Sequence, residues 1–393
     1  MRFSARTPAN LATNRLSAAL ADVRRSGGAV IDLTASNPTH AGFDYPTDLL
    51  APLAHPRGLD YAPEPLGLPA ARQAVARDFA RRGLTVSPDW IALACSTSEA
   101  YSLLFKLLCD PGDQVVVPRP SYPLFEHLTR LDSVDTVPYE LEYHGGWSID
   151  LDGLARAFTP RTRAVLIVNP NNPTGSFVSA AELDAIVALC AERGVAVISD
   201  EVFADYELTP GASAAAGRLI GQSDALGFTL GGLSKSIGLP QAKLAWIAMS
   251  GPADQVEGAR TRLDLICDTY LSVSTPVQAA AGDLLDRGLA VRAAIQQRIA
   301  TNRDLLAARV AREPSCEFLR ADGGWYAVVR VPSLAPEEEL VLTLLAEDGV
   351  LVHPGYFFDF PSESFLVVSL IAPEASFAHG IGRVLQRVGG GRR

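Results

Sequence analysis

Short runs of apolar residues recur between positions 90 and 250 and alternate with longer amphipathic stretches. The runs have the length of β-strands and cover residues 90–95, 114–118, 164–168, 195–199, 227–232 and 244–249. They are apolar at nearly every position instead of at every second one, which is typical of strands covered on both faces. The pattern therefore predicts an α/β domain with a mostly parallel sheet.

A second pattern begins after this region. Residues 290–312 contain no Pro or Gly and place their apolar side chains mostly along one stripe, which predicts one long helix. Shorter strand-like runs and another helical stretch then follow, at 325–332, 337–348, 349–353 and 365–370. This alternation indicates a smaller α+β domain.

The chain is long enough for two cores, with 393 residues of which 48% are hydrophobic. We expect a large domain of residues 46–288 and a small domain of residues 1–45 and 289–393, joined by the long helix at about 290–312.

Composition and charge exclude several classes of protein. The net charge of −10 and the absence of clustered Lys and Arg argue against a nucleic-acid partner. Five scattered cysteines without CxxC spacing indicate neither a disulfide framework nor a metal site. The N-terminal residues lack the apolar core of a secretory signal, and no apolar run reaches 18 residues. We expect a cytoplasmic protein with no membrane partner.

The most informative residue is Lys235. A lysine that forms a Schiff base with pyridoxal phosphate (PLP) needs small neighbours and a second cation for the phosphate. Gly231, Gly232 and Ser234 supply the first requirement and Lys243 the second. The alternative for a single lysine is a position on the surface.

Two polar residues follow apolar runs at distances that suit this pocket. Asp200 ends a predicted strand, where a carboxylate can pair with the pyridine nitrogen of PLP. Its alternative role is the N-cap of a helix. Asn172, in the loop NPNNPTG, can donate to the phenolate oxygen of PLP, or the loop is a plain turn.

A phosphate site is predicted in the segment CSTSEAYSLLFKLL. Thr97 and Ser98 lie at a strand-to-helix turn, where free backbone N–H groups and the helix dipole favour an anion. Their alternative is an N-cap with Glu99 in the first turn. Tyr122, in the next loop, is placed to stack on a planar ring, or it packs as an ordinary core residue.

The combination of motifs resembles the class I/II aminotransferases, which are PLP enzymes of fold type I, over nearly the whole chain. The motifs occur in the family's order: YAPEPLGLPAAR (61–72), STSEA (96–100), PSYPLF (120–125), NPNNPTG (169–175), SDEVF (199–203) and LSKSIGLPQAK (233–243). The resemblance implies a large domain with a mostly parallel, seven-stranded sheet covered by helices, and a smaller α+β domain.

The resemblance also assigns roles by position. Lys235 would be the Schiff-base lysine and proton shuttle. Asp200 would bind the pyridine nitrogen, Asn172 the phenolate oxygen, and Tyr122 would cover the ring. The phosphate would be bound by Thr97, Ser98 and Lys243, and Tyr61 would reach the phosphate of a neighbouring subunit. A homodimer with shared active sites follows. Candidate substrate-binding residues are Ser36, Arg330 and Tyr356.

Some positions depart from the family's pattern. Phe203 stands where the family usually has a tyrosine that supports the phenolate, and Gly232 where it often has a phosphate-binding serine. Lys243 replaces an arginine, so a point charge replaces a bidentate fork. Val367 stands where the family carries the arginine for the substrate's α-carboxylate. Either another cation takes that role, with Arg330 a weak candidate, or the substrate lacks the carboxylate.

The resemblance implies a transaminase that moves an amino group from an amino acid or amine to a keto acid by a ping-pong mechanism. A PLP-dependent lyase, cyclase, decarboxylase or oxidase is the first alternative, and a non-catalytic PLP-binding regulatory module is a remote one. The aromatic loops leave one further question open. Trp325, Tyr326, His353 and Tyr356 either line the substrate pocket or pack at a domain boundary.

Overall fold

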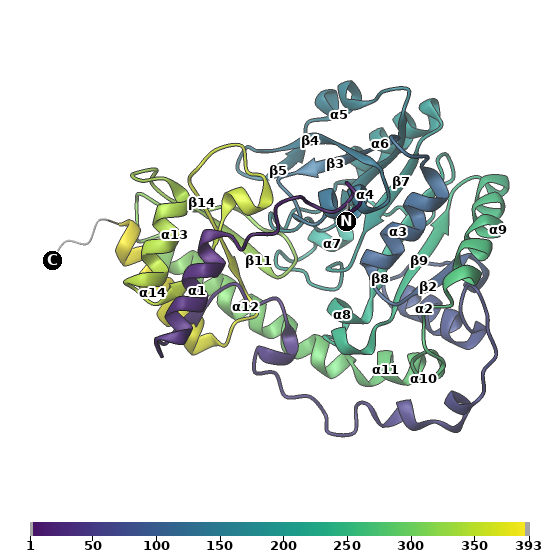
Figure 1. Cartoon of the computed structure of the whole chain (residues 1–393), viewed down its shortest axis with the longest axis horizontal. Coiled ribbons are helices and arrows are strands. Elements are labelled where there is room, and N and C mark those ends of the chain that lie inside the picture. The colour runs from purple at the N-terminus through teal and green to yellow at the C-terminus, as the bar shows by residue number, and fades with distance from the viewer. Residues whose placement is uncertain (1–2, 390–393) are drawn as a thin grey trace.

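The computed structural model describes residues 3–389. It contains one large sheet and two smaller sheets (Figure 1). One sheet has eight strands, which are β2 (Ile91–Ala94), β3 (Gln114–Arg119), β4 (Asp135–Tyr143), β5 (Trp147–Ile149), β6 (Thr162–Val168), β7 (Ala196–Asp200), β8 (Gly227–Gly232) and β9 (Ala245–Ser250). Their order across the sheet is β2-β9-β8-β7-β6-β3-β4-β5. The predicted apolar runs correspond to six of them.

The centre of this sheet is parallel, as predicted. Strands β8, β7, β6, β3 and β4 run parallel, whereas β9 is antiparallel to both of its neighbours. The sheet has one strand more than expected because β4 turns back through His144, Gly145 and Gly146 into the short edge strand β5. Polar residues alternate with apolar ones in β4, so a search for continuous apolar runs misses this hairpin.

Helices cover both faces of the sheet. Alternate residues of β6 show this arrangement, because Leu166 packs in the core with α3 (Thr97–Leu108) and α9 (Ala253–Tyr270). Ile167, the next residue, packs in a separate core with α5 (Leu151–Ala157) and α6 (Ala180–Arg193). Burial on both sides explains why these strands are apolar at every position.

The smaller sheets and their helices gather at the other end of the molecule (Figure 1). The strands are β1 (Ile31–Asp32) paired with β12 (Val350–Leu351), and a sheet in the order β10 (Glu317–Phe318), β11 (Tyr326–Arg330), β14 (Phe365–Ser369) and β13 (His353–Pro354). The helices beside them are α1 (Arg15–Arg25), α13 (Glu337–Ala346) and α14 (Glu374–Val388). The domain limits at residues 46 and 288 stay a prediction.

The predicted long helix is α12 (Leu289–Val310), and it contacts both groups of elements (Figure 1). The remaining helices are α2 (Pro69–Arg81), α4 (Phe125–Leu131), α7 (Ala212–Ala215), α8 (Leu233–Ser236), α10 (Thr275–Ala279) and α11 (Ala281–Arg287), with 3-10 turns at Pro38–His40, Ala51–Ala54, Pro56–Leu59, Pro88–Trp90, Pro240–Ala242 and Gly355–Phe358. None of the helices in residues 3–389 is both long and apolar enough to cross a membrane.

Candidate functional site

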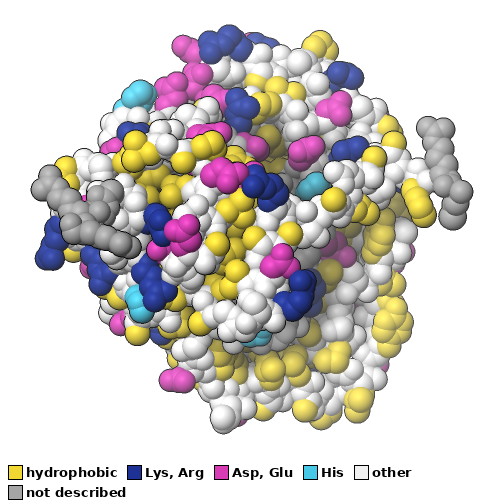
Figure 2. Space-filling model, turned by 60° about the vertical axis from the view of Figure 1, so that its left-hand side comes forward, with side chains coloured by type: hydrophobic (Ala, Val, Ile, Leu, Met, Phe, Trp, Pro, Cys, Tyr) yellow, Lys and Arg dark blue, Asp and Glu magenta, His cyan; other side chains and the backbone are white. Residues whose placement is uncertain are grey.

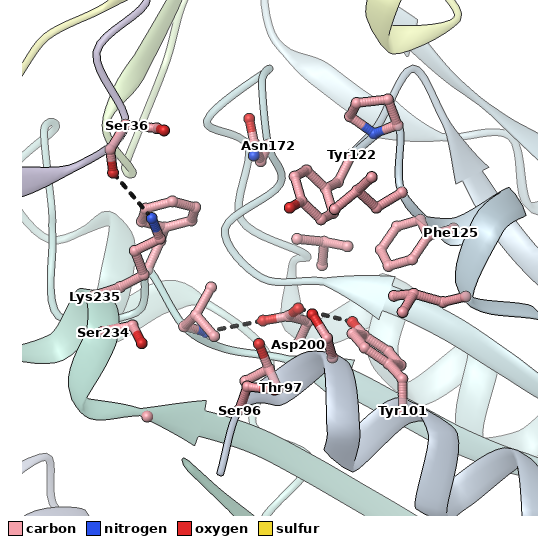
Figure 3. A pocket seen from close by; sticks show the side chains of 18 of the residues that line it. Ser36, Ser96, Thr97, Tyr101, Tyr122, Phe125, Asn172, Asp200, Ser234 and Lys235 are labelled. Carbon is pink, nitrogen blue, oxygen red and sulfur yellow. Dashed lines mark hydrogen bonds between the residues drawn. The ribbon is translucent and has the colours of Figure 1, made fainter. Parts of the chain in front are cut away.

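The carboxyl ends of the parallel strands meet at one edge of the large sheet, and a cavity of about 500 Å3 lies there. Strand β7 ends at Asp200, β8 is followed by Lys235, and β6 by the loop with Asn172. Strand β2 runs in the same direction as β8, because β9 is antiparallel to both, so the start of α3 reaches the same edge. Figure 3 shows these side chains around one space.

Lys235 lies in the one-turn helix α8 directly after β8. Its Nζ donates a hydrogen bond to the carbonyl oxygen of Ser36 at 3.2 Å and lies 5.8 Å from the Phe203 ring centre and 5.1 Å from that of Trp325 (Figure 3). Burial lowers the pKa of Lys235 to about 8, although Asp200 acts in the opposite direction. About a tenth of this amine is therefore uncharged at pH 7, far more than for an ordinary lysine.

The backbone that carries Lys235 is held from behind. The hydroxyl of Tyr206 donates to the Lys235 carbonyl at 2.6 Å, and Nε of Arg292, in α12, donates to the Ser236 carbonyl at 2.8 Å. Gly231 has no room for a side chain, since a Cβ there would lie 2.5 Å from Nε1 of Trp246. The glycines before Lys235 therefore allow close packing against β9.

Asp200 is a buried carboxylate. Its Oδ2 accepts a hydrogen bond from the Tyr101 hydroxyl at 2.7 Å, and its Oδ1 accepts one from the Val202 N–H at 3.1 Å (Figure 3). Burial raises its pKa, while these hydrogen bonds oppose the shift. The alternative role as a helix N-cap is wrong, because residues 202–205 form turns and no helix begins directly after Asp200. Asp200 faces a cavity that contains Lys235 as its nearest cation.

The asparagines of the loop 169–175 have different roles. Asn169 bonds to the backbone of Gly217 and Val178, and Asn171 bonds to Pro120, Thr174 and Ser121, which fixes the loop. Asn172 lines the cavity, and its buried Oδ1 has no hydrogen-bond partner among residues 3–389. A buried amide without a partner costs free energy, so this side chain is available for a ligand.

The start of α3 offers donors for an anion. Ser96 is the N-cap, since its hydroxyl accepts from the N–H of Glu99 at 3.1 Å, so the alternative that Thr97 or Ser98 is the cap is wrong. The N–H groups of Thr97 and Ser98 form no hydrogen bond within the described chain, and both residues line the cavity. Lys243 does not line the cavity, but its charge acts on Cys95, directly before Ser96.

A match to a known family shows where this chain belongs. The chain matches the family described as aminotransferase class I and II over residues 29–376. The chain belongs to the class I and II aminotransferases. It is therefore a PLP-dependent transaminase with fold type I, as the motifs predict.

Relatives of this aminotransferase share its length and fold. Glutamate-pyruvate aminotransferase AlaA of Escherichia coli K12 is 26% identical over 358 residues, which cover 88% of each chain. Aspartate/prephenate aminotransferase of Thermus thermophilus is 28% identical over 354 residues, with the same coverage. Among solved structures, alanine aminotransferase from Pyrococcus furiosus has a TM-score of 0.88 at 25% identity, covering 98% of this chain and 99% of that one.

Other predicted site residues of the aminotransferase fall in three places. Ser36 and Tyr122 line the cavity, and Tyr122 packs edge-on against Phe125 at 5.9 Å. Tyr61 is 73% exposed and lines a separate, narrow pocket beside Tyr270. Arg330 and Tyr356 do not line the cavity, because Arg330 is paired with Glu317 at 2.8 Å and Tyr356 is turned to the surface.

Some residues of the aromatic loops line the cavity and others pack outside it. Tyr326 and His353 line the cavity, whereas Trp325 is fully buried behind it and packs on Phe203. Phe203, at the position of the family's usual tyrosine, also lines the cavity. The aminotransferase therefore presents a ring without a hydroxyl beside Lys235.

Sequence reasoning missed several residues of the site. Tyr101 is the main one, because it donates to Asp200 from α3. The available signal is its position one helical turn after Thr97, on the same face of the helix. Phe357 and Phe358 also line the cavity, although the sequence gives only an aromatic cluster there.

Replacing Tyr101 by Phe is expected to weaken PLP binding. The variant removes a hydrogen bond to a charged carboxylate, which contributes about 1.5–3 kcal/mol, so the pKa of Asp200 rises further and the PLP dissociation constant increases about tenfold. Equilibrium dialysis of the apoenzyme measures this constant. Tyr139→Phe is the matched control, because Tyr139 is equally buried but donates to the Leu166 carbonyl. Equal losses in both variants would contradict the assignment.

The lowered pKa of Lys235 predicts unusual reactivity. In the protein without PLP, the amine of Lys235 is expected to react with an anhydride with a pH midpoint of about 8. Mass spectrometry of peptides can follow each of the three lysines, Lys106, Lys235 and Lys243. The same reaction in denaturant provides the control, with a midpoint near 10.4 for an unfolded lysine. A native midpoint above about 10 would show that burial does not lower the pKa.

Proposed function

We propose that this aminotransferase moves an amino group from an amino acid or amine to a keto acid in two half-reactions at one site, with Lys235 as the residue that moves the proton. The observation that carries the proposal is the position of Lys235. Its amine lies in the cavity with a pKa of about 8, near Asp200 and Asn172. An amine that is partly neutral near pH 7 is suited to act as both base and acid.

The residues around Lys235 fit PLP. The N–H groups of Thr97 and Ser98 would hold the phosphate, with the charge of Lys243 behind them. Asn172 lines the cavity, and its Nδ2 would donate to the phenolate oxygen of the ring. Tyr122 would cover one face of the ring. When bound, PLP withdraws electrons from the substrate's amino-bearing carbon and so makes its proton easier to remove.

Asp200 has the main electrostatic role in this proposal. A buried carboxylate is stabilised by a positive partner, and a protonated pyridine nitrogen would supply one. The hydrogen bond from Tyr101 holds the carboxylate in place. Lys235 would remove the proton from the amino-bearing carbon and return it to the carbon on the other side of the nitrogen. For this transfer, Nζ of Lys235 has to leave the Ser36 carbonyl.

Replacing Lys235 by Ala is expected to lower kcat by at least about 10²- to 10⁴-fold, because the group that transfers the proton is lost. The same variant should lose the visible absorbance of the holoenzyme. Lys106→Ala is the control, since Lys106 pairs with Asp132 outside the cavity. Product analysis accompanies both: keto acid and new amino acid formed in equal amounts support transfer, while ammonia or carbon dioxide would contradict it.

We also propose a homodimer in which Tyr61 completes the neighbouring site. Two observations support this: Tyr61 is exposed outside the cavity of its own chain, and Leu59, Leu265 and Tyr270 are exposed as well. Exposed apolar side chains of this size are typical of interfaces. A cytoplasmic location stays a prediction.

Mixing subunits tests the shared site. A preparation of Tyr61→Ala and Lys235→Ala chains, dissociated and reassembled together, should regain activity that neither variant has at limiting PLP, because the mixed dimer contains one intact site. Sedimentation velocity measures the assembly in parallel. A monomer, or mixed dimers with no regained activity, would contradict the shared site.

A further inference from the structure

Val367 stands at the position where the family carries an arginine that binds the substrate's α-carboxylate. This residue lies in β14 with 0% exposure, directly across from His353 of β13 on one side and Val328 of β11 on the other. Partners in an antiparallel pair point to the same face of a sheet. His353 lines the cavity and Val367 does not, so Val367 lies on the same face of the sheet but is covered by the residues that line the cavity.

The arginines nearest to this wall form ion pairs with glutamates outside the cavity. Lys235 and Asp200 are the charged residues among the described residues that line the cavity. Arg330, in β11, pairs with Glu317, and Arg119 pairs with Glu140 at a neighbouring cavity of about 370 Å3. No arginine of residues 3–389 lines the cavity. A carboxylate held there would be desolvated without a cation.

His353 does not replace the missing charge. Burial lowers the pKa of its imidazole to about 4, although Asp32 acts in the opposite direction. Its Nδ1 has no hydrogen-bond partner among the described residues. Its ring packs against Phe357 at 5.9 Å and Phe358 at 5.7 Å between ring centres. The imidazole is therefore neutral at physiological pH and behaves as part of an aromatic surface.

Further aromatic side chains line the same cavity. Phe203, Tyr326, Phe357 and Phe358 line it together with His353. A surface of this kind favours an apolar group by removing it from water, at about 25 cal/mol per Å².

We propose that the wall formed by His353 and these aromatic rings, with the uncharged Val367 behind His353, selects an amino compound without an α-carboxylate, namely a primary amine with an aromatic or large aliphatic substituent. The inference rests on the proposed function and names the substrate class of the same site. A keto acid serves the second half-reaction and binds with a high KM, because its carboxylate finds no cation on this wall.

The reaction is balanced without a further reagent. The C–N bond of the amine breaks, and its carbon gains a carbonyl oxygen from water and is oxidised by two electrons. The carbonyl carbon of the keto acid loses its own oxygen as water, gains the amino group and one hydrogen, and is reduced by two electrons. Lys235 carries the proton in each half.

Paired substrates give the direct test. The purified holoenzyme is assayed with phenylalanine and 2-phenylethylamine, and with leucine and 3-methylbutylamine, which differ in the carboxylate alone, with pyruvate as acceptor. The proposal predicts a kcat/KM at least about tenfold higher for each amine. Equal or higher values for the amino acids would overturn it while leaving the transaminase function intact. No transfer from any member would overturn both.

Two variants place a cation at the wall. His353→Arg is the first choice because His353 is partly exposed and lines the cavity, and Val367→Arg is the second. Each should shift the preference toward the amino acid by at least about tenfold, the value of a charge-assisted hydrogen bond. His353→Gln, which adds no charge, should keep the wild-type preference. An unchanged preference in a folded His353→Arg variant would contradict the proposal.

Binding without turnover gives an independent readout. Isothermal titration calorimetry compares 3-phenylpropanol with 3-phenylpropanoate on the wild-type holoenzyme and on His353→Arg. The wild type should bind the alcohol more tightly, and the variant should reverse the order. Tighter binding of the carboxylate to the wild type would show that a cation reaches this wall and would overturn the proposal.

Discussion

A buried carboxylate that lacks an ion-pair partner is the constraint on which the site depends. Asp200 is held by a tyrosine hydroxyl and one backbone N–H, and it forms no ion pair with the described residues. Burial of such a group costs several kcal/mol unless a positive charge compensates. In the proposed site, a protonated pyridine nitrogen of PLP would supply this positive charge at the end of β7.

The surrounding elements follow from where the parallel strands end. Lys235, Asn172 and the start of α3 are far apart in sequence but meet at one edge because their strands run in the same direction. The network behind Lys235 adds rigidity, since Tyr206 and Arg292 hold the backbone carbonyls from two different elements. On the face shown in Figure 2, acidic and basic side chains are interspersed and form no patch of one sign.

Much of this arrangement could be predicted from sequence, for identifiable reasons. Strands buried on both faces leave continuous apolar runs, so most of the large sheet could be predicted, whereas the alternating β4 and the three-residue β5 could not. Lys235, Asp200 and Asn172 lie in motifs with a fixed order. Tyr101 lies in an ordinary amphipathic helix, so its bond to Asp200 appears only in three dimensions. Arg330 looked available in sequence, but its pairing with Glu317 is a tertiary contact.

The proposed site attaches the cofactor to Lys235. Reduction of the PLP-loaded protein with borohydride fixes PLP to the lysine that holds it, and mass spectrometry of the digested protein identifies the peptide. The account predicts PLP on Lys235, with Lys106 and Lys243 unmodified. Attachment at either of the other lysines, or no covalent attachment, would contradict it.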